Sequence, residues 1–271
     1  MNSTFCLILY IISLASFSQT KTLQILSKKD SIPLDNVLIY NQSTSKYGYT
    51  NKSGNYNLKY NNAKDIILIS LPGYIQKKTQ ASSLSNAIYL KNEIRELDEV
   101  IINAPNFKEF NSFSPKIKNP YKTSFISSGG ALLCSINLKR KFKNDSLIGF
   151  SVKIKNSKRD AFVRPILVEV NKETRKWEFL LQTPKTIALP TKSNDIRFNL
   201  RDFSIKFDKQ NNYLIGFEII EHNDLENKIQ VYGGKNRKSK LYLRADPMSD
   251  WEEVENLNYS LEYKLYIKDA N

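Results

Sequence analysis

Four side chains that can bind metal ions stand close together in one stretch of the chain: Glu218, Glu221, His222 and Asp224. A histidine flanked by carboxylates could hold a hard cation such as calcium. The spacing matches neither the EF-hand loop nor the His-Glu-x-x-His pattern of zinc enzymes, which hold their ligands at fixed intervals. Because Glu221, His222 and Asp224 follow an apolar run that ends at Ile220, we expect a polar hairpin loop after it and predict no metal site and no cofactor.

Two further motifs have both a chemical and a structural explanation. Cys134 stands in the apolar stretch 131–136 with no histidine nearby in the sequence to activate it, so we expect a buried, unreactive thiol. The triplet Gly-Gly-Lys at 233–235 lacks the spacing of the phosphate-binding loop G-x-x-x-x-G-K-[ST]. We predict a hairpin turn there. No residue is assigned a catalytic role.

Aromatic side chains are the remaining candidates, because flat rings can stack on sugars. Trp251 stands in a polar context between Asp250 and Glu252, which makes it the better carbohydrate-binding candidate, and Trp177 is the second. The competing explanation is that both rings close a sandwich core. Exposure beside a concave face would favour carbohydrate binding, whereas burial would favour the core.

The chain carries a formal net charge of +14, which raises the question of a nucleic-acid partner. A nucleic-acid-binding protein clusters its basic residues with stacking aromatics. Here the lysines are scattered, and the densest basic runs, 139–141 and 235–238, are short. We therefore predict solvated basic faces and no nucleic-acid partner. Acidic envelope polysaccharide and lipid headgroups remain as electrostatic partners.

The N-terminal segment predicts export. Residues 1–18 carry no charged side chain, and an apolar run over 5–14 is followed by small residues, the pattern of a signal peptide with cleavage before Gln19. The run is shorter than the roughly 20 residues of a membrane-spanning helix, which is the alternative interpretation. Cys6 follows Phe5 inside the run, so we expect no lipid attachment.

The mature chain is expected to lie in the periplasm, on the outer-membrane surface or outside the cell. No later apolar stretch reaches spanning length, so we predict no transmembrane span. Cys134 is the only cysteine after residue 18, which excludes an intramolecular disulfide. The length fits two domains, and nothing in the sequence fixes the oligomeric state.

Residues 20–102 show the pattern of short strands separated by turn residues. The predicted strands lie at 22–26, 37–41, 47–50, 56–59, 66–70, 74–79 and 87–90. Seven such strands in about 80 residues predict a Greek-key sandwich. The apolar runs at 37–40 and 66–69 suit strands that are covered on both faces.

The turns between these strands carry a resemblance to a known family. In order they are 33–37 (Pro-Leu-Asp-Asn-Val), 50–56 (Thr-Asn-Lys-Ser-Gly-Asn-Tyr) and 68–74 (Leu-Ile-Ser-Leu-Pro-Gly-Tyr). Gly54 can take the positive φ of a tight hairpin, and Pro72-Gly73 forces a turn. Together they resemble the carboxypeptidase regulatory-like, transthyretin-like domain of Bacteroidota envelope proteins. The segment 97–102 (Leu-Asp-Glu-Val-Ile-Ile) is similar to the strand that precedes the plug of TonB-dependent receptors.

The resemblance implies an accessory module without catalytic residues of its own. A zinc carboxypeptidase needs two histidines and a glutamate on the metal, and this chain has a single histidine. The roughly 170 residues after position 102 are too few for both a receptor plug and a large barrel.

Residues 103–128 predict a linker or an extended crossing segment, because the strand pattern is interrupted by Pro105, Pro115 and Pro120. Phenylalanines at 107, 110 and 113 recur every third position. They suit one helical turn packed on a domain, or anchors for a partner.

Residues 129–270 predict a second β-domain, a jelly-roll-like sandwich. Its nine predicted strands lie at 131–138, 147–154, 164–170, 178–181, 195–199, 213–220, 229–232, 240–243 and 259–266. Alternation at 150–154 and 261–266 indicates one solvated face. The stretches 164–170, 198–200 and 214–218 are similar to a C-terminal domain that accompanies the regulatory-like module in uncharacterised Bacteroidota proteins.

The sequence as a whole predicts an all-β, exported, non-enzymatic interaction or structural module of the cell envelope or periplasm. Its expected partner is an envelope protein or polysaccharide. The alternative is a carbohydrate-binding protein that uses the C-terminal sandwich through Trp251 and Trp177. A third possibility is a glycosidase built on scattered carboxylates.

Overall fold

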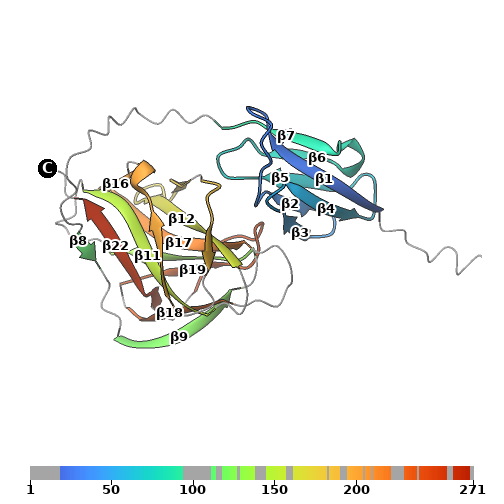
Figure 1. The fold of residues 1–271 in the computed structure, drawn as a ribbon. Coiled ribbons are helices and arrows are strands. Elements are labelled where there is room, and N and C mark those ends of the chain that lie inside the picture. Colours follow the sequence, from blue (N-terminus) through green and yellow to red (C-terminus); the bar gives the residue numbers. More distant parts are fainter. Residues whose placement is uncertain are drawn as a thin grey trace, which may run out of the picture. The chain divides into compact units, whose positions relative to one another are not determined.

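The computed structural model describes residues 19–93, 111–113, 118–126, 129–137, 145–156, 161–181, 183–189, 194–203, 205–208, 210–220, 229–236, 238–254 and 259–268. The chain divides into a first unit, residues 1–94, and a second unit, residues 95–271. Both are built from β-strands (Figure 1), as the sequence predicted. The predicted signal peptide, 1–18, and the segment 97–102 lie outside the described residues. Within the described ranges no helix is long and apolar enough to cross a membrane.

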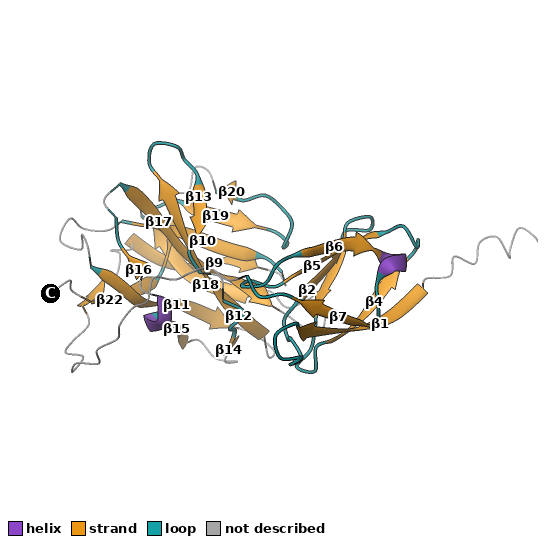
Figure 2. Ribbon diagram, turned by 90° about the horizontal axis from the view of Figure 1, so that it is seen from above, coloured by secondary structure: helices purple, strands orange, loops and turns teal. Residues whose placement is uncertain are grey.

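The first unit has one sheet of three strands and one of four. The three-stranded sheet has the order β4-β1-β7 and the four-stranded sheet the order β3-β2-β5-β6 (Figure 2). The strands are β1 Gln19–Ser27, β2 Leu38–Asn41, β3 Lys46–Tyr49, β4 Asn55–Tyr60, β5 Ile66–Ser70, β6 Lys77–Gln80 and β7 Ala87–Leu90. All seven coincide with predicted strands, to within a few residues at their ends.

The core of the first unit follows from the alternation of side chains along each strand. Leu23 and Ile25 of β1 and Ile88 of β7 point inward and are almost fully buried. In β5 the consecutive residues 67–69 are all buried, so the prediction of a strand covered on both faces is confirmed. Each fully buried Leu or Ile side chain contributes roughly 1.5–3 kcal/mol.

The hairpin at residues 50–56 forms as its sequence requires. Gly54 adopts a φ of 72°, and a Cβ there would lie 2.5 Å from the carbonyl oxygen of Ile25. The side-chain oxygen of Asn51 accepts hydrogen bonds from the N–H groups of Ser53 and Asn55, each at 3.0 Å. Glycine is therefore needed both for the backbone conformation and for the close approach of β1.

The second unit is a sandwich of two larger sheets. The seven-stranded sheet has the order β13-β12-β17-β10-β19-β20 with β14 paired to β12, and the eight-stranded sheet has the order β21-β18-β11-β22-β8 with β15 and β16 paired to β11 and β9 to β18. The strands are β8 Asn111–Phe113, β9 Lys118–Ile126, β10 Ala131–Ile136, β11 Ser146–Asn156, β12 Ala161–Asn171, β13 Trp177–Phe179, β14 Ile187–Leu189, β15 Asn194–Asn199, β16 Ile205–Lys206, β17 Asn211–Ile220, β18 Ile229–Lys235, β19 Leu241–Arg244, β20 Glu252–Glu253, β21 Tyr259–Leu261 and β22 Tyr263–Lys268.

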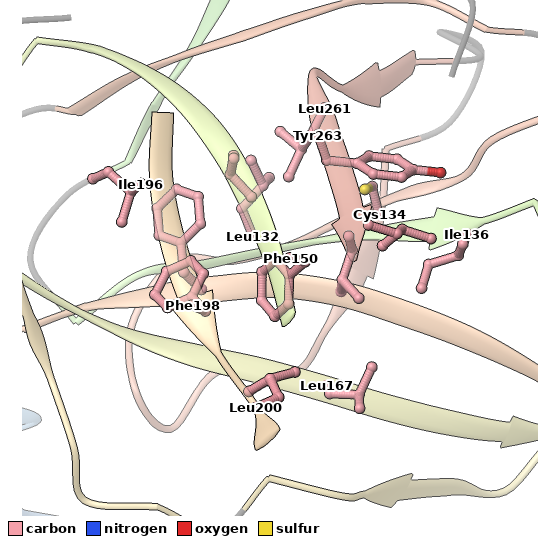
Figure 3. Close-up of a cluster of buried hydrophobic side chains, with 14 of the residues drawn as sticks. Leu132, Cys134, Ile136, Phe150, Leu167, Ile196, Phe198, Leu200, Leu261 and Tyr263 are labelled. Carbon is pink, nitrogen blue, oxygen red and sulfur yellow. The ribbon is translucent and has the colours of Figure 1, made fainter. Parts of the chain in front are cut away.

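The main core of the second unit lies between these two sheets (Figure 3). Leu132 and Cys134 of β10 point into it, as do Phe150 of β11 and Phe198 of β15, whose rings are 4.8 Å apart. In β11 and β22 the outward residues Lys153 and Lys264 are partly or fully exposed, as the predicted alternation requires, whereas the outward Ser151 is buried.

The predicted linker requires a correction. Within 103–128, the described residues form β8 and β9, which pair with β22 and β18 of the second unit. The edges of β18 and β22 carry backbone N–H and C=O groups that need hydrogen-bond partners, and these segments pair with them. The sequence of residues 103–128 does not by itself reveal this pairing. Pro120, which has no N–H, stands where the β9–β18 register shifts, a position that suits proline at a sheet edge. Phe113 lies in β8 and not in a helical turn, whereas Phe107 and Phe110 lie outside the described residues.

The predicted hairpin turn at 233–235 is also wrong, because these residues belong to β18. A Cβ on Gly233 would lie 2.5 Å from the carbonyl oxygen of Ser260 in β21. The glycine thus permits a close approach of two paired strands. The unpredicted strands β14, β16 and β20 have only two or three residues each. Such strands are too short to show an alternation of apolar and polar residues in the sequence.

Candidate functional site

The outer face of the seven-stranded sheet carries side chains from five neighbouring strands. Residues that are paired across strands share a face. The pairs Arg164–Glu218, Ala131–Glu218 and Ala131–Arg244 form one row across β12, β17, β10 and β19. Tyr242 stands two residues before Arg244, and so on the same face. At the edge of the sheet, Trp177 pairs with Val170 of β12.

An apolar floor lies on this outer face, separate from the main core. It consists of six buried residues: Ala131, Leu133, Ile166, Val168, Val170 and Leu214. Trp177, Tyr242 and Trp251 are partly buried and pack on this floor. The seven-stranded sheet is therefore covered by apolar side chains on both faces, and the rings close the outer layer while keeping part of their surface in solvent.

The ring of Trp177 contacts the other two rings. Trp177 and Tyr242 meet edge to face, with ring centroids 5.1 Å apart and planes at 88°. Trp177 and Trp251 are 6.1 Å apart at 41°. We call Trp177, Tyr242, Trp251 and the neighbouring Arg244 the aromatic face. The structure thus brings together the two tryptophans that the sequence put forward separately, although they are 74 positions apart.

A turn before β20 holds Trp251 in place. The carboxylate of Asp246 accepts hydrogen bonds from the N–H groups of Met248 and Ser249, at 2.8 and 2.9 Å. Partial burial acts to raise the pKa of Asp246, but these bonds and the hydroxyl of Ser249 outweigh it, so the pKa is lowered. Asp246 therefore stays ionised and keeps the turn closed at neutral pH.

Two arginines share one glutamate beside the rings. Arg164 Nη1 lies 3.4 Å from Glu218 Oε2, and Arg244 Nη2 lies 3.1 Å from Glu218 Oε1. The three side chains are only 7%, 16% and 10% exposed, for Arg164, Arg244 and Glu218 in turn. The small side chain of Ala131 between β17 and β19 leaves room for Arg244 to cross. The guanidinium of Arg244 also lies 5.0 Å from the ring centroid of Trp251, a cation–π contact.

These contacts commit Glu218 to ion pairing. The other members of the metal-capable stretch, Glu221, His222 and Asp224, lie outside the described residues. In the part of the chain that the structure describes, no group of three or more histidine, cysteine or acidic side chains is placed to hold a metal ion.

A second ion pair lies at the rim of the aromatic face. Lys240 Nζ is 2.8 Å from Glu253 Oε2. The hydrogen bond to Glu253 raises the pKa of Lys240, and burial raises the pKa of Tyr242. Both side chains therefore keep their usual protonation state at neutral pH, with Tyr242 as a neutral hydrogen-bonding phenol.

Sequence analysis did not identify Tyr242, Arg244 or Arg164 as members of a site. The signal that could have found two of them is the alternation Leu-Tyr-Leu-Arg at 241–244. It places an aromatic and a cationic side chain on the same face of one strand.

Cys134 is confirmed as a buried cysteine. Figure 3 shows its sulfur beside the ring of Tyr263 in the main core. Burial raises the pKa of the thiol to about 12, far above its usual value, so almost no thiolate forms at neutral pH.

We expect Cys134 to resist alkylation in the folded chain. At about pH 8 its thiolate fraction is roughly a thousandfold below that of an exposed cysteine with a pKa near 8.5. Iodoacetamide should leave the Cys134 peptide unmodified in native buffer and modify it fully in concentrated urea, as measured by mass spectrometry. Rapid modification of the native chain would contradict the burial.

Comparison with known proteins gives no family. No protein-family model matches the chain, and no curated protein matches it. A solved structure of carbohydrate-binding modules of the β-sandwich superfamily aligns with 10% identity and a TM-score of 0.22 over 87% of this chain and 97% of that chain. A crystal structure of the infectious bursal disease virus T13 particle aligns with 8% identity and a TM-score of 0.23 over 93% of this chain and 62% of that chain. TM-scores this low carry no information about function.

Proposed function

We propose that the protein is an exported, non-enzymatic module of the cell envelope or periplasm that binds its partner through the aromatic face of the second unit. One observation carries this proposal: Trp177 and Trp251, from distant parts of the chain, meet on one outer sheet face and both remain partly exposed. The signal-like segment at 1–18 and the resemblance of residues 20–102 to the regulatory-like module support export and an accessory role.

The chemistry of the aromatic face favours a carbohydrate as the partner. Indole and phenol rings offer flat apolar surfaces to the C–H faces of sugars, and their polar edges can bond to hydroxyl groups. Arg244 adds a guanidinium donor beside Trp251. A few fixed polar groups next to apolar rings are the usual composition of a small-ligand site.

Two of the acidic side chains near the rings are held in ion pairs, which favours binding over catalysis by these two groups. A glycosidase needs two carboxyl groups free to act as acid and as base or nucleophile. Glu218 is shared by Arg164 and Arg244, and Glu253 is paired with Lys240. Neither carboxylate is available in that role while these ion pairs hold.

The Trp251→Ala variant tests the proposal. We expect glycan binding by the chain from Gln19 onward, found on a glycan array and measured by calorimetry, to weaken at least tenfold, a loss of about 1.4 kcal/mol. Tyr89→Ala, which removes an exposed ring from the first unit, is the matched control and should bind as the wild type does. Circular dichroism checks that both variants are folded.

Unchanged glycan binding by Trp251→Ala would contradict a role for the aromatic face. A silent array, together with a specific envelope protein recovered by pull-down and lost with Trp251→Ala, would replace the carbohydrate by a protein partner. Export has its own test, because N-terminal sequencing of the protein from its source should return Gln19 and not Met1.

A further inference from the structure

The exposed large apolar side chains of the first unit gather toward one end of its three-stranded sheet. Among its described residues they are Ile32, Ile75 and Tyr89, which are 57%, 49% and 50% exposed. Single exposed apolar residues are ordinary on protein surfaces, whereas a group of them indicates an interaction site.

Backbone pairing places Tyr89 on the outer face of the sheet. Tyr89 of β7 pairs with Leu26 of β1, and Leu26 pairs with Pro33 on its other side. Ile25 and Ile88 alternate with Leu26 and Tyr89 and point into the core. Tyr89, Leu26 and Pro33 therefore form one row on the outer face, with β7 at the edge of the sheet (Figure 1).

The next row adds two lysines. The N–H of Lys28 donates to the carbonyl of Leu90, and the N–H of Ile75 donates to the carbonyl of Lys91, both at 2.8 Å. These bonds bring Lys28, Lys91 and Ile75 side by side, each of them exposed. The carbonyl of Ile32 accepts the N–H of Ser27 at 2.9 Å, so Ile32 lies at the same end but opposite Ser27, which alternates with the outward Leu26 and Lys28. We call Lys28, Ile75, Tyr89 and Lys91 the basic–apolar patch.

The charge around the patch is positive. Residues 19–93 contain ten lysines and four carboxylates, a net charge of +6, and no arginine. Lys29 and Lys77 lie close to the patch in the sequence. Both nearby acidic residues are engaged in interactions: the carboxylate of Asp30 accepts a hydrogen bond from the N–H of Ile32 at 3.3 Å, and Glu93 interacts as well. Within two residues of the patch in the sequence, four lysines thus stand against two carboxylates.

The residue types distinguish between kinds of partner. Protein–protein interfaces are enriched in arginine and depleted in lysine. A lipid surface presents diffuse negative charge, which lysines attract as point charges without a fixed geometry. Exposed aliphatic side chains and a tyrosine suit the boundary between headgroups and acyl chains, where one end is apolar and the other is wet.

We propose that the basic–apolar patch docks the first unit on the surface of an anionic lipid bilayer. Lys28 and Lys91 contact the headgroups, and Ile75 and Tyr89 enter the interface. The attachment is weak and reversible, because it rests on a few charges and a small apolar area. It is independent of the aromatic face, which belongs to the other unit.

Vesicle flotation with the chain from Gln19 onward tests this proposal. Vesicles of phosphatidylethanolamine with phosphatidylglycerol should float the protein at low salt, and high salt should release it. Phosphatidylcholine vesicles should bind it far less. The double variant Lys28→Gln/Lys91→Gln should lower the partition coefficient at least tenfold, because each lysine near such a surface strengthens binding by roughly fivefold. Ile75→Ser/Tyr89→Ser should lower it comparably.

The matched control is Lys46→Gln/Lys64→Gln. It removes two exposed lysines of the same unit, Lys46 at the start of β3 and Lys64 in the β4–β5 connection, at the opposite end of the strands. This variant should float as the wild type does. An environment-sensitive fluorophore on the thiol of Ile75→Cys should shift to the blue with anionic vesicles, whereas the same label on Lys46→Cys should not. Native Cys134 is buried and stays unlabelled.

Equal losses for both lysine pairs would overturn the patch in favour of a general charge effect. Absence of flotation on anionic vesicles would overturn it outright. A fluorophore shift that depends on protein concentration without lipid would replace the bilayer by a second copy of the chain.

Discussion

The Glu218→Gln substitution is expected to lower the free energy of unfolding of the second unit by about 3–5 kcal/mol. Glu218 is the shared counter-charge of Arg164 and Arg244, which are 7% and 16% exposed. Glutamine keeps the shape of the side chain but leaves two guanidinium groups facing each other without an anion. Removing one partner of a buried charge cluster costs more than the cluster contributes, because the remaining charges stay desolvated.

Tryptophan fluorescence can measure this loss for the second unit alone. The chain has two tryptophans, Trp177 and Trp251, and both belong to that unit. The urea midpoint of Glu218→Gln should fall at an unchanged slope. Glu253→Gln is the matched control, because the side chains of its ion pair are well exposed, Glu253 at 38% and Lys240 at 60%. Its loss should stay below about 1 kcal/mol.

Two further outcomes bear on the ion cluster. Equal small losses in both variants would mean that the two arginines reach solvent and that the cluster is not buried. Simultaneous replacement by Arg164→Met, Glu218→Leu and Arg244→Met should recover much of the stability, because an apolar set of similar volume removes the desolvation penalty. That triple variant should still lose ligand binding if the guanidinium of Arg244 contacts the ligand.

The Gly216→Ala substitution is expected to cost about 3 kcal/mol or more, or to prevent the second unit from folding. A Cβ on Gly216 would lie 1.7 Å from the carbonyl oxygen of Leu132 and 2.9 Å from the Cα of Leu133. Both atoms belong to the backbone of β10, which cannot rotate away as a side chain could. Strands β17 and β10 would have to separate in the middle of the seven-stranded sheet.

Three glycines of the second unit give a graded test of this argument. The nearest backbone oxygen to an added Cβ is at 1.7 Å for Gly216, 2.5 Å for Gly233 and 2.7 Å for Gly149. The loss of stability on substitution by alanine should be largest for Gly216 and smaller for the other two. Alanine also lowers the entropy of the unfolded chain by a few tenths of a kcal/mol to about 1 kcal/mol, an equal offset in all three. A Gly216→Ala variant as stable as the wild type would contradict the close approach.

The sequence by itself determined where most strands lie. Alternation and turn residues are short-range properties, so all seven strands of the first unit and the longer strands of the second could be predicted from them. The positive φ of Gly54 and the burial of Cys134 followed from neighbours a few positions away. The all-β sandwich fold rested on these local signals.

Strand pairing was decided only by the tertiary structure. The sequence of β8 and β9 predicted a linker, because it is rich in proline and polar residues. These segments form strands because β22 and β18 pair with them. Gly233 was predicted as a turn residue, yet it lies in β18, where a glycine is needed because Ser260 of the neighbouring strand leaves no room for a Cβ. The local pattern of one strand does not show which other strand it pairs with.

The candidate surfaces depend on the same long-range choice. Trp177 and Trp251 were each visible in the sequence, but their contact, and the sharing of Glu218 by Arg164 and Arg244, depend on the register of five strands. The basic–apolar patch likewise depends on the parallel pairing of β1 with β7. A slip of one residue would turn these side chains to the opposite face. Local pattern therefore fixes which residues can share a face, and only the register of the folded sheets fixes which of them meet.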